Sequence, residues 1–184
     1  MLYIVKRIRS AVKIPLSVDL ERGYTNDLSL LNEHIQALID AGISGINMED
    51  AQGADVYLEK LNSITTYLKN THQQLFINAR TDLFLQKLAS PVETVIERAK
   101  LYEEAGANGL FVPGISDADM IKQIVSATSL PVNVVSTPAI SVKALEACGV
   151  KRISMATSLY RSTYNNMEKT AKEILKTRSF EAMF

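Results

Sequence analysis

The sequence contains little that would place the protein outside the ordinary globular class. Its single cysteine, Cys148, cannot form an internal disulfide and is typical of a reducing compartment. No apolar run approaches the roughly 20 residues that span a bilayer, and the charged opening, residues 1–7, precedes no apolar segment of the signal-peptide kind. Lys plus Arg and Asp plus Glu both number 20, so no net charge favours nucleic acid or an anionic membrane. These absences predict a cytoplasmic protein with no nucleic-acid and no membrane partner.

The chain also lacks any linker, low-complexity segment or visible second domain. Its 184 residues suffice for a buried core, and the 47% hydrophobic and 22% charged residues are ordinary globular values. We therefore expect a single domain over residues 1–184.

Short apolar segments rich in β-branched residues alternate with longer stretches of helical periodicity. Within the periodic stretches, apolar residues recur at spacings of three and four, as in Leu28, Leu31, Ile35 and Leu38. The expected strands cover residues 14–18, 45–48, 75–78, 109–112, 132–135 and 152–155. Helix starts are predicted where a capping residue or an early proline precedes the periodic run, at Asp27, Ser90-Pro91, Ser116-Asp117 and Ser141. Helix ends are predicted at the glycines that follow small residues, Gly42, Gly106 and Gly149.

Strict alternation of strand and helix indicates an α/β fold, with a parallel sheet covered by helices. An open doubly wound sheet and a (β/α)8 TIM-type barrel both satisfy this pattern. The barrel is favoured because no Gly-x-Gly-x-x-Gly follows the first strand, and because polar residues collect at the strand ends that form a barrel's mouth. A barrel needs eight strands in roughly 250 residues. We therefore expect an incomplete barrel of about six βα units whose first two strands are missing, either a fragment or a chain completed by another.

Acidic residues and an arginine end three consecutive strands. Alternation would point Asp19 and Glu21 to the same side, where they repel each other unless a cation lies between them. Hard oxygen ligands of this kind suit Mg²⁺ or Mn²⁺. Glu49 ends the second strand, and Arg80 ends the third, where it could clamp a substrate carboxylate or phosphonate.

Simpler roles are open for the same residues. Asp50 and Asp82 could cap the helices that follow them. Arg80 could form a structural ion pair with Glu49. Tyr24 is a candidate pocket residue, because Gly23 allows the backbone to turn at the mouth.

Six segments resemble, in order and at similar spacing, the signature segments of the isocitrate lyase / phosphoenolpyruvate mutase superfamily. The resemblance runs from about residue 14 to residue 175. The segments are VDLERGY at 18–24, GINMED at 45–50, NARTD at 78–82, ANGLFVPG at 107–114, PVNV at 131–134, and residues 152–154 followed by Arg161.

The resemblance implies a Mg²⁺-dependent enzyme, a lyase, decarboxylase or hydrolase, that cleaves a C–C or P–C bond of a small 2-oxo acid through a metal-stabilised enolate. Asp19, Glu21 and Glu49 would hold the metal directly or through water. Arg80 would bind the substrate carboxylate and offset developing charge. Asn133 would contact the substrate from a later strand.

By the same likeness, Arg80, Glu49 and Tyr24 are the expected catalytic residues, and Asp50 joins the substrate-binding set. The resemblance also implies a homo-oligomer, because family members exchange their last helix between subunits. Tyr160 and Tyr164 lie at helical spacing after the last strand, where helix packing and subunit contact are equally open.

The sequence departs from the family after Asp50. Residues 51–60 contain no cysteine or histidine, so the long lid of isocitrate and methylisocitrate lyases is missing, which argues against those two activities. The lid segment of phosphonate-handling members is also absent, which leaves oxaloacetate-type substrates favoured. The alternative is a non-catalytic remnant of such a barrel. A phosphate-binding sugar barrel is disfavoured because no glycine-rich loop follows the last strands.

Overall fold

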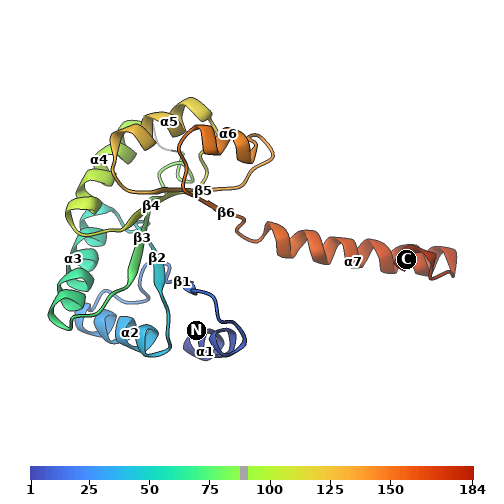
Figure 1. Ribbon diagram of the computed structural model, residues 1–184, viewed down its shortest axis with the longest axis horizontal. Helices are drawn as coiled ribbons and strands as arrows, with labels where there is room; N and C mark the ends of the chain where they lie inside the picture. Colours follow the sequence, from blue (N-terminus) through green and yellow to red (C-terminus); the bar gives the residue numbers. More distant parts are fainter. Residues whose placement is uncertain (88–90) are drawn as a thin grey trace. The chain divides into compact units, whose positions relative to one another are not determined.

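The computed structural model describes residues 1–87 and 91–184, and it falls into two compact units, Met1–Ile153 and Ser154–Phe184. In the first unit a six-stranded sheet curls into a half-barrel whose outer side is covered by helices (Figure 1). The elements, in chain order, are α1 (Leu2–Ala11), β1 (Ser17–Asp19), α2 (Leu28–Asp40), β2 (Gly45–Glu49), α3 (Ala54–Asn70), β3 (Phe76–Arg80), α4 (Pro91–Glu104), β4 (Gly109–Val112), α5 (Ala118–Ala127), β5 (Val132–Val135), α6 (Val142–Ala147), β6 (Arg152–Ser154), α7 (Ser158–Thr177) and η1 (Glu181–Met183).

The strand order distinguishes the two candidate architectures. The strands neighbour one another in chain order, β1-β2-β3-β4-β5-β6, and the pairs from β1 to β5 are parallel. A doubly wound sheet would reverse its strand order at a switch point, whereas sequential order is that of a barrel wall. The predicted incomplete (β/α) barrel is therefore confirmed.

The expected strand positions hold to within a few residues, and the differences have local causes. β1 begins at Ser17 rather than at residue 14, because Pro15 has no N–H to donate to a ladder. β2 and β3 continue to Glu49 and Arg80, one and two residues beyond their apolar runs. The backbone pairing of a central strand thus persists where its side chains become polar.

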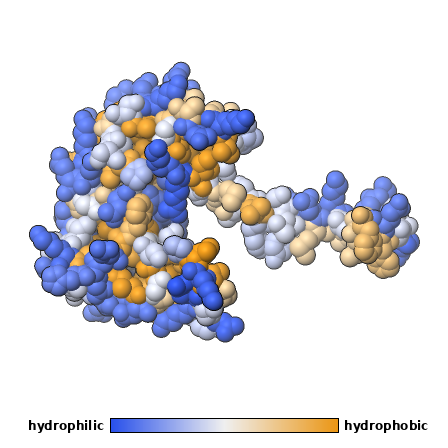
Figure 2. Space-filling model, viewed as in Figure 1, coloured by the Kyte–Doolittle hydropathy of each residue, from blue (hydrophilic) through white to orange (hydrophobic). Residues whose placement is uncertain are grey.

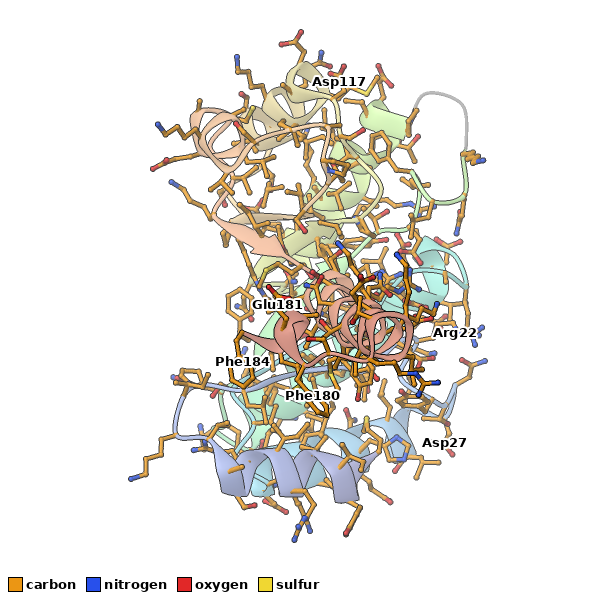
Figure 3. The ribbon with its side chains drawn as sticks, turned by 90° about the vertical axis from the view of Figure 1, so that its right-hand side faces the viewer. Arg22, Asp27, Asp117, Phe180, Glu181 and Phe184 are labelled. Atoms are coloured by element: carbon orange, nitrogen blue, oxygen red, sulfur yellow. The ribbon has the colours of Figure 1, made fainter. Side chains whose placement is uncertain are left out.

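Helix starts follow the predicted caps. The Asp27 side chain accepts bonds from the backbone N–H groups of the first turn of α2, and Asp117 does the same for α5 (both labelled in Figure 3). Ser141 caps α6. α4 begins at Pro91, as predicted, while Ser90 lies outside the described residues.

The predicted helix ends are confirmed by backbone geometry. Gly42, Gly106 and Gly149 have φ angles of 76°, 94° and 87°. These values lie in the left-handed region that a residue with a Cβ rarely adopts, so glycine is required where each helix turns into the next strand.

The two faces of the half-barrel differ in polarity. The outward strand residues and the inner helix faces form one apolar core, and Figure 2 shows hydrophilic residues over the helical outer side of this unit. The inner face is polar instead. Parallel register aligns Asp19 with Asn47 and Asn47 with Asn78, and the Asn78 amide donates to Asn47 at 2.8 Å. One layer higher, Glu49 aligns with Arg80.

The second unit consists of α7 and η1. Taken by itself, α7 is an amphipathic helix of 20 residues with no buried side chain. Among the residues that the structure describes, no helix is both long enough and apolar enough to cross a membrane. The expectation of one domain over residues 1–184 stays a prediction.

Candidate active site

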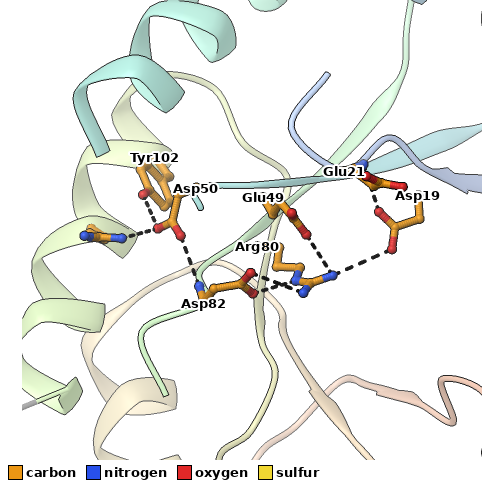
Figure 4. A network of polar contacts seen from close by, with 8 residues as sticks. Asp19, Glu21, Glu49, Asp50, Arg80, Asp82 and Tyr102 are labelled. Carbon is orange, nitrogen blue, oxygen red and sulfur yellow. Dashed lines mark hydrogen bonds and ion pairs between the residues drawn. The ribbon is translucent and has the colours of Figure 1, made fainter. Parts of the chain in front are cut away.

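The carboxyl ends of the first three strands bring three predicted residues together. Asp19, Glu49 and Arg80 are the last residues of β1, β2 and β3, and parallel strands place these ends at one edge. Arg80 Nη1 lies 3.0 Å from Glu49 Oε2 and 3.8 Å from Asp19 Oδ2 (Figure 4). The structural ion pair between Arg80 and Glu49 is thus present, at the position where a substrate clamp was predicted.

Arg80 is held on two further sides. Its Nε and Nη2 donate to the two carboxylate oxygens of Asp82 at 2.7 and 3.2 Å, a bidentate pair. Its Cζ lies 5.9 Å from the centroid of the Phe111 ring. Burial lowers the pKa of Arg80, but the hydrogen bond and charge of Asp82, followed by the charges of Glu49 and Asp19, raise it overall. The guanidinium is therefore a fixed positive charge in a set orientation.

The carboxylates at this edge carry more negative charge than one guanidinium offsets. Burial is the main cause that raises the pKa of Glu49; Arg80 opposes it, while Asp82, Asp19 and Glu21 raise it further. Additional positive charge beside Glu49 would favour its ionised form. Electrostatically, this edge of the sheet is suited to a cation.

Glu21 and Tyr24 occupy the loop that follows β1. The strand ends at Asp19, and Glu21 and Tyr24 have φ angles of 48° and 59°, so the strand alternation expected to carry through Glu21 is broken. Tyr24 Oη donates to Glu21 Oε1 at 3.1 Å, and the Glu21 backbone N–H donates to Asp19 Oδ1 at 3.0 Å. Glu21 thus orients Asp19 through its backbone, while its carboxylate lies with Tyr24.

The donor chemistry of this edge fits Mg²⁺. Over residues 1–87 and 91–184, no three His, Cys, Asp or Glu side chains are grouped closely enough to bind a metal ion together. Asp19 and Glu49, however, both lie within 4 Å of one guanidinium nitrogen. Mg²⁺ is usually held by one or two carboxylates and keeps several of its waters, so two neighbouring carboxylates are a sufficient protein contribution.

Asp50 belongs to a buried network behind this edge. Its carboxylate accepts from Arg98 Nη1 at 2.5 Å, from Tyr102 Oη at 2.6 Å and from the Asp82 backbone N–H at 3.0 Å (Figure 4). It does not cap α3, whose N-cap is Gly53 with no side-chain bond. Asp50 therefore fixes the backbone of the residue that orients Arg80.

Sequence reasoning missed Arg98 and Tyr102. The two lie four residues apart on α4, on the side that buries Val95 and Ala99. Burial and then the charge of Asp50 raise the pKa of Tyr102, so its hydroxyl stays a hydrogen-bond donor. The available signal was a charged residue inside the apolar face of a predicted helix, which requires a buried partner.

Asn133 lies on β5, in register with Phe111 of β4. Its side chain is 1% exposed, and neither its amide nitrogen nor its amide oxygen has a hydrogen-bond partner in the described part of the chain. A buried amide without partners is costly. This is the kind of group that a bound ligand would satisfy.

A curled parallel βα sheet with carboxylates and a fixed arginine at its carboxyl edge defines a (β/α)-barrel enzyme class. The chain belongs to the phosphoenolpyruvate phosphomutase family, which matches residues 1–175, and so to the isocitrate lyase / phosphoenolpyruvate mutase superfamily. The relationship predicted from the six sequence segments is confirmed.

Several relatives and structures support this membership. An oxaloacetate decarboxylase of Rhodopseudomonas palustris strain HaA2 is 30% identical over 143 residues, which cover 73% of this chain and 49% of the relative. An uncharacterised protein of Mycobacterium tuberculosis strain H37Rv is 30% identical over 146 residues, 79% of this chain and 55% of the relative. A crystal structure from Burkholderia cenocepacia J2315 superposes with a TM-score of 0.85 at 31% identity, covering 97% of this chain and 75% of that chain. The chain spans about half the length of these curated relatives.

Proposed function

We propose that the protein is a Mg²⁺-dependent lyase, decarboxylase or hydrolase that cleaves a C–C or P–C bond of a small 2-oxo acid, with oxaloacetate-type substrates favoured over phosphonopyruvate-like ones. The observation that carries the proposal is the Arg80 guanidinium, held by Asp82 between Asp19 and Glu49 at the carboxyl edge of the sheet. A relative that is an oxaloacetate decarboxylase supports the choice of substrate.

In this proposal Asp19, Glu21 and Glu49 would hold Mg²⁺, or Mn²⁺, directly or through water. When bound, the ion supplies a Lewis acid for the oxo and carboxylate oxygens of the substrate. Arg80 binds a substrate carboxylate through the guanidinium N–H groups that Asp82 does not engage, and it offsets the negative charge that develops as the bond breaks. Its orientation by Asp82 means that little reorganisation is needed during the reaction.

The remaining predicted residues receive roles that follow from their surroundings. Asn133 offers its unpaired buried amide to the substrate. Tyr24 is a catalytic candidate at the mouth; its hydroxyl hydrogen is donated to Glu21, so its oxygen is left to accept from the substrate or from water. The Asp50 carboxylate already accepts three hydrogen bonds, so we assign it an indirect effect on substrate binding, through the position of Asp82 and Arg80.

The test follows pyruvate formation from oxaloacetate by the intact protein. We expect turnover that EDTA abolishes and Mg²⁺ restores, and that Asp19→Asn strongly reduces. Because divalent ions decarboxylate oxaloacetate slowly by themselves, the rate of the same buffer without protein is subtracted. A protein that binds no Mg²⁺ by calorimetry and turns over no 2-oxo acid would be the non-catalytic remnant instead.

We further propose that the protein is a homo-oligomer in which α7 is exchanged between subunits. α7 buries none of its side chains, and Tyr160 and Tyr164 form a ring pair with centroids 4.4 Å apart. A helix with an unburied apolar stripe is stabilised by covering that stripe.

Light scattering coupled to size exclusion should give a mass that is a multiple of 20.3 kDa, and Leu159→Asp should shift this mass toward that of the monomer. A wild-type monomer at all concentrations contradicts this proposal.

A further inference from the structure

A polar cavity lies beside the β1–α2 loop, and most of its lining has no role in the proposed reaction. Its volume is about 330 Å³, which is within the range of small-molecule sites. Asp19, Glu49, Arg80 and Asp82 do not line it, whereas Glu21 and Tyr24 belong both to this cavity and to the proposed active site. Its lining residues are Glu21, Arg22, Tyr24, Thr25, Asn26, Gln52 and Lys60.

Lys60 is the unusual residue of this cavity. It lies on α3, is 3% exposed, and its Nζ donates to the backbone oxygen of Arg22 at 2.6 Å and to Gln52 Oε1 at 2.9 Å. Both acceptors are uncharged. Among the residues that the structure describes, no carboxylate lies within 4.0 Å of Lys60. A buried ammonium normally has a paired acid, and two acceptors leave one of its three donors unused.

The rest of the lining adds positive charge and neutral hydrogen-bonding groups. Arg22 (labelled in Figure 3) has no ion-pair partner in the described ranges either. Burial lowers the pKa of Lys60, and the nearby charge of Arg22 lowers it further. Glu21 is the one acid of the lining, and its Oε1 accepts from Tyr24. With two cations and one carboxylate, the cavity keeps an excess of positive charge.

The neutral groups are placed for hydrogen bonding to a ligand. Thr25 Oγ1 accepts from the Asp27 backbone N–H at 3.0 Å, which leaves its own hydroxyl hydrogen free to donate. Asn26 lines the cavity as well and carries two amide donors. Asp27, which follows Asn26, is occupied by the first turn of α2.

We propose that this cavity binds a small oxyanion, the carboxylate or phosphate group of a small metabolite, with Lys60 and Arg22 as its charged contacts. An oxyanion would give Lys60 the counter-charge that the described protein groups do not provide. The site goes beyond the proposed reaction and does not depend on it. It adjoins the active-site edge through residue 21, whose backbone bonds to both Asp19 and Glu49.

The experiment measures anion binding to the full chain by calorimetry and by thermal unfolding. Inorganic phosphate and acetate are the two probes, and chloride at equal ionic strength is the reference. We expect at least one probe to bind and to raise the unfolding midpoint of the wild-type protein. Lys60→Met should weaken that binding about tenfold or more, because it removes the charge and keeps the buried aliphatic stem.

Two matched variants make the result specific. Lys69→Met introduces the same change at an exposed position of the same helix and should leave anion binding unchanged. The Lys60-dependent part of the binding should also be unchanged in Arg80→Met, because Arg80 does not line the cavity. Binding of phosphate alone or of acetate alone identifies the ligand group.

Three outcomes would overturn the proposal. The first is no binding of either probe by the wild-type protein. The second is binding that Arg80→Met abolishes and Lys60→Met spares, which would place the anion at the active-site edge. The third is an equal loss in Lys69→Met, which would indicate non-specific attraction. None of these readouts requires turnover. A negative result for the anion site is therefore distinguishable from a negative result for the proposed enzymatic function.

Discussion

Arg80→Met is expected to lower kcat/KM for the 2-oxo acid substrate by about 10²–10³-fold, because one preorganised charged donor at a reacting oxyanion contributes about 2.7–4 kcal/mol. The substitution removes the charge that faces Glu49 and Asp19 and the bidentate pair with Asp82. Steady-state kinetics with saturating Mg²⁺ measures the effect. Arg80→Lys should recover only part of the activity, since lysine cannot reproduce the planar two-bond geometry.

The control for this experiment is Arg7→Met, which makes the same change on an exposed turn of α1. It should leave kcat/KM unchanged. Circular dichroism of both variants separates loss of activity from loss of fold. If Arg80→Met kept wild-type kcat/KM while its unfolding midpoint fell, the guanidinium would be the structural ion pair that the sequence left open, and the clamp hypothesis would be wrong.

The position of this site was predictable because strand ends are encoded locally. Apolar runs followed by polar residues placed Asp19, Glu49 and Arg80 at three strand ends, and parallel pairing brings such ends together. Glu21 was less predictable, because its position depends on a left-handed backbone that alternation does not foresee. The late start of β1, at Ser17, was also not predicted. Pro15 has no backbone N–H to donate to the sheet, and the apolar pattern of the segment does not reveal the loss of one donor.

The polar residues of the helices were the part that local patterns did not resolve. Lys60 follows Tyr57 by three residues and precedes Ile64 by four, so the helical period places it on the buried face of α3. The same reasoning applies to Arg98 on α4. A charge on such a face requires a partner, but the sequence does not say which residue comes near it from another element. Only the tertiary structure shows that Arg98 meets Asp50, 48 positions away, and that Lys60 meets no acid of residues 1–87 and 91–184.

Asp50→Ala is expected to produce the largest loss of stability among single substitutions at this edge, about 3–5 kcal/mol, because removing one partner of a buried ion pair leaves the other charge uncompensated. Arg98 and Tyr102 would lose their acceptor, and the Asp82 backbone N–H would lose its own. Urea denaturation should show a lower midpoint at an unchanged slope. Asp55→Ala, at an exposed position in the first turn of α3, is the matched control and should cost a few tenths of a kcal/mol.

The second arm of this experiment separates charge from packing. The double variant Asp50→Ala/Arg98→Met leaves neither charge without its partner. Its loss of unfolding free energy should therefore be smaller than the sum of the losses in the two single variants. A strictly additive result would mean that the Arg98–Asp50 pair contributes no coupling, despite its 2.5 Å contact. Because Asp50 also fixes the backbone of Asp82, the double variant should remain impaired in kcat/KM even where its stability recovers. Recovery of both would show that the network supports the fold alone and leaves the orientation of Arg80 unaffected.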